Sequence, residues 1–145
     1  MNLFQLLTTK NETMYLLEDM DLSSAMDKLR ASGYTAVPVI RDDGTYAGTV
    51  SEGDFLRAFI DGKDTDSQGD SLPLKSIVRT DRNPSVKIDV DISQVFAEAL
   101  NQNFVPVEDD SDNFIGIIRR KDILEYCYKK SRAGQTLMNK EGKGA

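Results

Sequence analysis

The sequence predicts an α/β protein of two pseudo-symmetric halves, each with the order helix–strand–helix–strand–strand–helix. Two observations predict this fold class. The tripeptide VPV at residues 37–39 recurs 68 residues later at 105–107, and Gly48 recurs at the same shift as Gly116. The apolar positions that follow each glycine also recur in register. An internal repeat of this kind indicates two copies of one structural unit.

Each half is expected to open with a short helix, over residues 3–7 and 74–78, followed by a strand over 13–17 and 85–89. The next element is an amphipathic helix, because apolar residues follow Asp21 and Asp91 at spacings of three and four. Each Asp stands where an N-cap belongs. The two apolar stripes are Leu22, Ala25, Met26 and Leu29, and Ile92, Val95, Phe96 and Ala99.

The first of these helices is expected to end at Gly33, since glycine suits the left-handed position after a helix. The second offers Asn101 or Asn103 in that place, and two missing residues there change the shift of the repeat from 70 to 68. A β-hairpin then follows in each half. Its strands are expected over 36–40 and 46–50, around Asp-Asp-Gly, and over 104–107 and 114–118, around EDDSDN.

A final helix closes each half, and a polar segment rich in Gly and Asp separates the two halves. We therefore expect a first motif over 1–62, a linker over 63–72, a second motif over 73–131 and a basic flexible tail over 132–145. A half of this size cannot cover its own sheet, so the two halves should pack together.

Composition excludes several classes of function. The 145 residues include no histidine, which excludes histidine-based triads and histidine-ligated metals. Cys127 is the single cysteine, which excludes an internal disulfide and fits a reducing cytoplasm. It aligns with Phe59 in the repeat, and we expect it in the core. No segment has the length and apolarity of a membrane span or the features of a signal peptide.

The net charge is −6, and the residues before the tail are more acidic still. An acidic body argues against nucleic-acid binding, which needs a basic face. The loop Glu108–Asp112 has neither the spacing nor the glycine of a calcium-binding loop, and it reads as a polar hairpin turn.

The pair Ser51 and Asp54 has two interpretations. A Ser three residues before an acid caps a helix by itself. The same hydroxyl and carboxylate at a helix start also suit a nucleotide. The second half has Arg119 in place of the Ser but retains Asp122, which favours a role for the carboxylate beyond capping.

The segments GYTAVPVIRDDGTYAGTVSEGDFL and NFVPVEDDSDNFIGIIRRKDIL resemble the two motifs of a cystathionine-β-synthase (CBS) domain pair, or Bateman module. The resemblance covers roughly residues 1–131. It implies a regulatory, non-catalytic module that binds adenosine-containing ligands between its halves and forms homodimers. The run FIGIIRRKDIL also resembles stand-alone bacterial CBS-pair proteins that bind cyclic di-AMP, which keep a hydroxyl before the Arg-Arg pair.

The resemblance also implies where a ligand lies. In the first half it places Ser51 and Asp54 at ribose and phosphate, with Tyr34, Thr35 and Ala36 near the base. In the second half it places Asp122 at the ribose, with Asn103 and Phe104 near the base.

The basic run Arg119, Arg120 and Lys121 suits phosphate, because arginine grips phosphate oxygens through paired donors. It also has a simpler interpretation as a solvated stretch. We therefore expect AMP, ADP, ATP or cyclic di-AMP as the regulatory ligand rather than S-adenosylmethionine, with no cofactor required and an unidentified target protein. The alternative is a structural CBS dimer without a physiological nucleotide.

Overall fold

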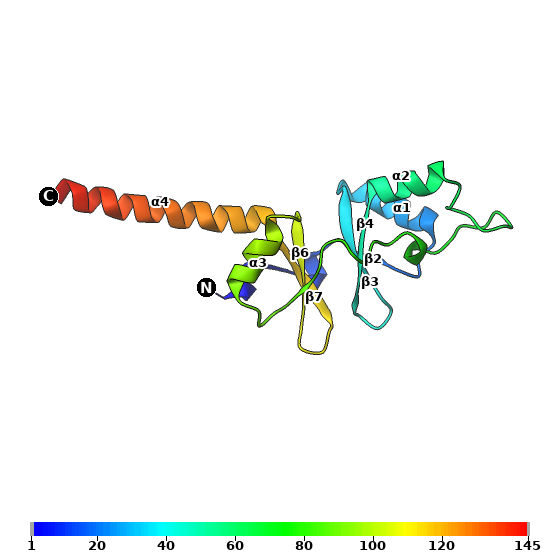
Figure 1. Cartoon of the computed structure of the whole chain (residues 1–145), viewed down its shortest axis with the longest axis horizontal. Coiled ribbons are helices and arrows are strands. Elements are labelled where there is room, and N and C mark those ends of the chain that lie inside the picture. The colour runs from blue at the N-terminus through cyan, green and yellow to red at the C-terminus, as the bar shows by residue number, and fades with distance from the viewer. Residues whose placement is uncertain (1, 145) are drawn as a thin grey trace.

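The computed structural model describes residues 2–144, with side chains described through Arg132. The predicted α/β class and the predicted order of elements are confirmed, with two sheets and four α-helices in the described part. Figure 1 shows two α/β lobes side by side, and the last helix extends away from them. Each lobe contains one of the two repeated hairpins.

The first lobe has a three-stranded sheet of order β2–β3–β4, in which β2 runs parallel to β3 and β4 antiparallel to it. Its elements are β2 (Leu16–Leu17), α1 (Leu22–Ser32), β3 (Ala36–Ile40), β4 (Tyr46–Ser51) and α2 (Glu52–Ile60).

The second lobe has a four-stranded sheet of order β1–β7–β6–β5, which repeats the same pattern and adds β1 at one edge. Its elements are β1 (Leu7–Thr9), β5 (Val86–Lys87), α3 (Ile92–Ala99), β6 (Phe104–Glu108), β7 (Phe114–Arg119) and α4 (Arg120–Gly144).

The amphipathic helices begin where their cap residues predict. A carboxylate oxygen of Asp21 accepts the backbone N–H of Ser24 at 2.7 Å, and one of Asp91 accepts that of Ser93 at 3.0 Å. Gly33 follows α1 with a φ of 76°, as the left-handed C′ position requires. The apolar stripes then bury Leu22, Ala25 and Leu29 in one core and Val95 and Ala99 in the other.

The short opening segments cross between the lobes. The 3₁₀ turn η3 (Leu74–Ser76) inserts the fully buried Leu74 into the core of the first lobe. The 3₁₀ turn η1 (Leu3–Gln5) and the following Leu6 pack in the core of the second lobe. Each lobe is therefore completed by a segment from the other end of the chain, and the lobes do not coincide with the sequence ranges 1–62 and 73–131. The intervening 3₁₀ turn η2 is Lys10–Glu12.

The two repeated glycines allow these crossings. A Cβ at Gly116 would lie 2.1 Å from the carbonyl oxygen of Thr8 in β1, and one at Gly48 would lie 2.6 Å from the carbonyl oxygen of Arg79. Their φ angles of 153° and 151° are also unfavourable for other residues. At each glycine a segment from elsewhere in the chain pairs closely with the hairpin's second strand, β1 with β7 at Gly116 and Arg79 with β4 next to Gly48.

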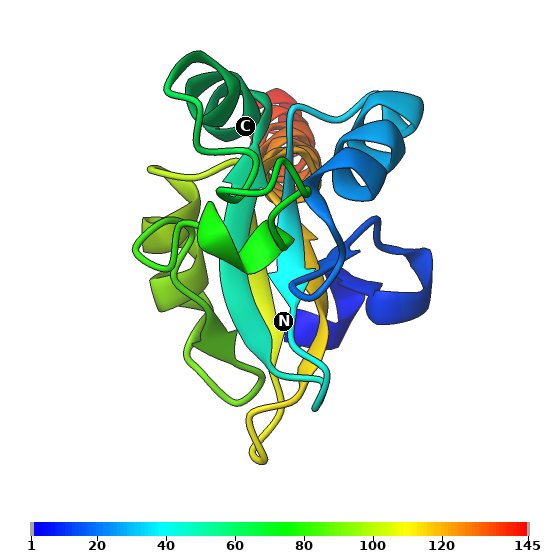
Figure 2. The ribbon, with the colours of Figure 1, turned by 90° about the vertical axis from the view of Figure 1, so that its right-hand side faces the viewer.

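The two sheets face one another through an apolar cluster of Ile40, Phe104, Phe114 and Ile117. Figure 2, turned by 90°, places one sheet in front of the other. The ring of Tyr46 stacks on Phe114 with centroids 6.2 Å apart. Its hydroxyl donates to the carbonyl oxygen of Asn83 at 2.9 Å, and burial raises the pKa of Tyr46 to about 12. The lobes are thus joined by apolar contact and by specific hydrogen bonds.

Several elements differ from their expected bounds. The strands β2 and β5 have two residues each rather than five, and β1 was not expected. The helix α4 continues to Gly144, so the structure has a helix where a flexible tail over 132–145 was expected. Cys127 is exposed on α4, and its expected burial is wrong because it lies on a face that the second lobe does not cover. Within residues 2–144, no helix is long and apolar enough to cross a membrane.

Candidate functional site

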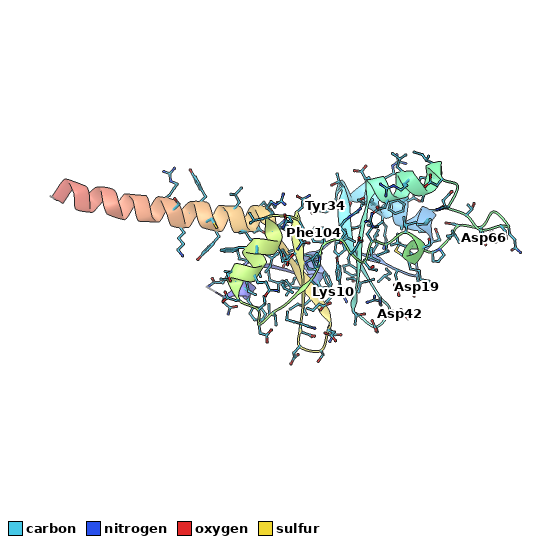
Figure 3. The ribbon with its side chains drawn as sticks, in the orientation of Figure 1. Lys10, Asp19, Tyr34, Asp42, Asp66 and Phe104 are labelled. Carbon is cyan, nitrogen blue, oxygen red and sulfur yellow. The ribbon has the colours of Figure 1, made fainter. Side chains whose placement is uncertain are left out.

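A first cleft, with a volume of about 390 Å³, opens between the two lobes. Figure 3 labels Tyr34 and Phe104, which lie on its two sides. The first-lobe side comes from the start of β3 and from the residues before β2, and the second-lobe side from β6, β7 and the start of α4. Its lining residues are Thr8, Glu12, Thr13, Met14, Tyr34, Thr35, Ala36, Val37, Asn103, Phe104, Ile117, Arg119, Arg120 and Lys121.

One part of this cleft is apolar and the other is basic. Met14, Ala36 and Phe104 provide an apolar slot next to the exposed residues Tyr34 and Thr35. The basic run Arg119–Lys121 enters where β7 ends and α4 begins, so it stands at a helix N-terminus, where the helix dipole favours an anion. This combination suits a flat apolar group joined to an anionic one.

Arg119 is held by Asp122 in the first turn of α4. Its Nε donates to Oδ2 at 2.8 Å and its Nη2 to Oδ1 at 3.3 Å. The retention of Asp122 beside an Arg therefore has a structural explanation, because the pair fixes the direction of the guanidinium. The carboxylate itself is not among the residues that line either cleft.

Arg120 connects the start of α4 to the end of α3. Its Nε donates to the carbonyl oxygen of Ala99 at 2.8 Å, and its Nη1 donates to Oδ1 of Asn103 at 3.0 Å. The backbone N–H of Arg120 donates to the carbonyl oxygen of Asn103 at 2.8 Å. A cation at a helix C-terminus is favourable, so Arg120 stabilises the wall of the cleft as well as lining it.

A second cleft of about 660 Å³ lies on the other side of β3 and β6. It shares Ala36, Asn103, Phe104 and Arg120 with the first. Its remaining lining residues are Ser51, Asp81, Arg82, Asn83, Pro84, Glu98, Asn101 and Gln102. Among the described residues, Oε1 of the buried Gln102 is the only buried side-chain nitrogen or oxygen atom without a hydrogen-bond partner.

The Ser51 and Asp54 pair forms a capping box at the start of α2. Oγ of Ser51 accepts the backbone N–H of Asp54 at 3.3 Å, and Oδ2 of Asp54 accepts that of Ser51 at 2.8 Å. The capping interpretation is therefore correct for the local structure. The same two side chains also receive hydrogen bonds from Arg82, which sequence reasoning did not single out.

The structure recombines the predicted site residues across the lobes. Tyr34 and Thr35, expected beside Ser51 and Asp54, lie instead in the first cleft with Arg119–Lys121. Asn103 and Phe104, expected beside Asp122, reach both clefts. No sequence pattern predicted this regrouping, because the repeat describes each half and not how the halves pair.

The acidic hairpin loop after β6 is a polar turn, as expected. Oδ1 of Asp109 accepts the backbone N–H groups of Ser111 and Asn113, both at 2.9 Å. These bonds lower the pKa of the Asp109 carboxyl. In the part of the chain that the structure describes, no group of three or more acidic or cysteine side chains is arranged to hold a metal ion.

Two repeated α/β motifs that face one another across composite clefts define a CBS domain pair. The family model for the CBS domain matches residues 7–61 and 74–129, and the chain belongs to this family. A curated relative, cyclic di-AMP receptor B of Bacillus subtilis (strain 168), is 26% identical over 114 residues, which are 78% of this chain and 77% of the relative.

Solved structures share the fold. The structure of CbpB in complex with c-di-AMP superposes with a TM-score of 0.83 at 23% identity, over 94% of this chain and 90% of that one. CbpB from Streptococcus agalactiae superposes with a TM-score of 0.73 at 26% identity, over 83% of this chain and 76% of that one.

Proposed function

We propose that this protein is a non-catalytic receptor that binds an adenine nucleotide in the first cleft and signals to a partner protein. The preferred ligand is cyclic di-AMP, with AMP, ADP and ATP as the other candidates. The observation that carries the proposal is the basic run Arg119–Lys121 beside an apolar slot between the lobes. The relative named as a cyclic di-AMP receptor supports the choice of ligand.

The apolar side of the cleft is suited to a base. An adenine ring needs apolar surfaces on its faces and backbone groups at its edge. Met14, Ala36 and Phe104 offer the former, and the backbone of Tyr34 and Thr35 offers the latter. We assign the base to this slot.

The basic side of the cleft is suited to phosphate. A guanidinium has five N–H donors. Arg119 uses two of them on Asp122, and Arg120 uses three on Ala99, Leu100 and Asn103. Both retain donors, and the ammonium of Lys121 is exposed. A phosphate would meet three cations here, whereas the sulfonium of S-adenosylmethionine would be repelled.

Ligand binding between the lobes gives a route to an output. A ligand that contacts both lobes stabilises the arrangement in which its two walls are correctly spaced. A homodimer would carry this change to a target protein, and we assign its interface to the exposed apolar side chains of α2 and α4. They are Leu56, Phe59, Ile60, Leu124 and Tyr128. A cytoplasmic setting follows from such a ligand.

One observation favours the alternative of a structural dimer without a nucleotide. The signature carboxylate of each motif is already paired with an arginine, Asp54 with Arg82 and Asp122 with Arg119. Neither carboxylate needs a ligand for its charge to be satisfied. The two functions differ in whether any adenylate stabilises the fold.

A thermal-shift panel tests the proposal, because a ligand that binds only the native state raises the Tm by mass action. The panel contains cyclic di-AMP, AMP, ADP, ATP, adenosine and S-adenosylmethionine. We expect a rise in Tm with cyclic di-AMP, reduced in Lys121→Ala and retained in Lys75→Ala, which removes the same charge outside both clefts. No response to any of these ligands at saturation favours the structural dimer.

A further inference from the structure

Arg82 makes contacts that neither the repeat nor the proposed nucleotide site requires. It lies in the segment between Arg79, whose backbone bonds that of Thr49 in the first lobe, and β5 in the second lobe, and its side chain contacts the start of α2. Its Nη1 donates to Oδ2 of Asp54 at 2.8 Å, and its Nη2 donates to Oδ1 at 3.3 Å. Nη1 also donates to Oγ of Ser51 at 3.0 Å. One guanidinium thus engages both side chains of the Ser51–Asp54 pair.

The carboxylate at the centre of these contacts is deeply buried. The side chain of Asp54 is 3% exposed, while that of Arg82 is 33% exposed. A buried carboxylate is strongly destabilising unless it is paired, and here the nearest cation comes from the segment that connects the lobes. Arg57 on the same helix lies farther away, at 3.7 Å. The Asp54–Arg82 pair therefore holds the first lobe to a segment whose next residue, Asn83, donates a hydrogen bond to the carbonyl oxygen of Phe104 in the second lobe.

A nucleotide in the second cleft would need the atoms that Arg82 already occupies. Oδ2 of Asp54 accepts from both the backbone of Ser51 and Arg82, and Oδ1 accepts from Arg82. A carboxylate oxygen has about two lone pairs. Oδ2 is therefore filled and Oδ1 retains one acceptor position on a side chain that is 3% exposed, so a pair of ribose hydroxyls could bind this carboxylate only if the guanidinium left it.

The first cleft has the opposite charge at the corresponding position. The repeat aligns β2 with β5 at a shift of 70, since Leu16 pairs with Val39 as Val86 pairs with Val107. With this shift, Glu12 in the first half is the residue equivalent to Arg82 in the second half. Glu12 lines the first cleft, where it is exposed. The first cleft thus has an acidic residue where the second has a cation. The two signature carboxylates also differ in their partners, since Asp122 pairs with Arg119 of its own motif and Asp54 with Arg82 of the other motif.

We propose that Arg82 is the intramolecular occupant of the second cleft. Its ion pair with Asp54 clamps the lobes together and excludes nucleotide from this cleft, so that one chain binds one nucleotide, in the first cleft. The stoichiometry rests on the proposed function, whereas the clamp does not. Without Arg82 the cleft would offer Ser51, which lines it, and the Asp54 carboxylate, which the guanidinium now engages.

Calorimetric titration with AMP and with cyclic di-AMP tests the exclusion. We expect one site per chain in the wild-type protein and a second AMP site in Arg82→Met, which is lost again when Asp54→Asn is added. Arg79→Met is the matched control, since its side chain pairs with Asp81 and does not contact Ser51 or Asp54. Two sites per wild-type chain, or one site in Arg82→Met, overturn the exclusion.

Thermal unfolding of the same variants without nucleotide tests the clamp. Arg82→Met leaves the buried carboxylate with only the longer contact to Arg57, so its Tm should fall by about 5 °C or more. Adding Asp54→Asn should recover part of that loss, because the amide has no charge to compensate. Additive losses in the double variant overturn the clamp. If no nucleotide binds to any variant, the proposed function fails, and this cycle still decides for or against the clamp.

Discussion

Arg120 at the start of α4 donates a hydrogen bond of 2.8 Å from Nε to the carbonyl oxygen of Ala99 at the end of α3. Its neighbour Lys121 is exposed and has no comparable structural role. Two adjacent cations of the first cleft thus differ in what they support. One stabilises the second lobe, and the other is available to an anion.

This difference predicts separable effects of two substitutions. Arg120→Ala should lower the free energy of unfolding by about 1–2 kcal/mol, because carbonyl groups at the end of α3 lose their donor, and should also weaken nucleotide binding. Lys121→Ala should weaken binding with little change in unfolding. Urea denaturation and calorimetric titration measure the two quantities. Equal losses of stability in both variants would contradict the assignment.

Gly116 and Gly53 are predicted to respond oppositely to alanine. Gly116→Ala would place a Cβ 2.1 Å from the carbonyl oxygen of Thr8 at a φ of 153°, and we expect a loss of about 2–5 kcal/mol. Gly53 lies in α2, where a Cβ has ordinary contacts, and alanine should be neutral or stabilise by up to about 1 kcal/mol. Urea denaturation of both variants tests this, and a stable Gly116→Ala protein would show that β1 does not pair with β7 as described.

The raised pKa of Tyr46 predicts that the protein loses stability at high pH. Burial raises the pKa of its phenol from 10.0 to about 12, so the folded state favours the neutral form. A group with a raised folded-state pKa contributes its full stability below the unfolded pKa and loses it as the pH rises through the folded value. We expect the Tm to fall between about pH 10 and 12 and to fall less in Tyr46→Phe. Identical profiles for the two proteins would exclude Tyr46 as the source.

The apolar side chains of α2 and α4 predict a dimer. In Figure 1 these helices lie at the same edge of the molecule, opposite the two hairpin turns. Ile60 is 74% exposed and Leu124 is 68% exposed, so Ile60→Lys and Leu124→Lys should leave the fold intact and dissociate the dimer. Leu100→Lys, on the equally exposed end of α3, is the control. Sedimentation of a wild-type monomer at tens of micromolar, roughly the range of ordinary interfaces, would count against the dimer.

The repeat made the fold predictable, while the contacts between the halves were not. The caps Asp21 and Asp91 and both hairpins follow from local signals, which act within a few residues. Leu3 and Leu74 exchange lobes, and nothing local distinguishes packing in one core from packing in the other. The contact between Arg82 and Asp54 could not be predicted for the same reason. A single cation in a polar segment has no sequence pattern that indicates its partner.

Several residues that line the first cleft were singled out from the sequence, but their grouping was not predicted. Sequence reasoning identified Arg119–Lys121 from their charge and from the departure of Arg119 from the signature, and Tyr34–Ala36 from the resemblance to CBS domain pairs. It did not show that they share one cleft, because they come from different halves of the repeat. The length of α4 was also missed, since residues 132–145 contain few apolar residues at helical spacing.

Calorimetric titration of cyclic di-AMP into the wild-type protein, Arg119→Ala and Lys75→Ala tests the central claim most directly. The account predicts saturable binding to the wild-type protein and to Lys75→Ala, and a loss of about tenfold or more in affinity for Arg119→Ala, since a charge-assisted contact contributes about 1.5–3 kcal/mol. Absence of binding to the wild-type protein, or an affinity that Arg119→Ala leaves unchanged, would contradict a nucleotide receptor built on the first cleft.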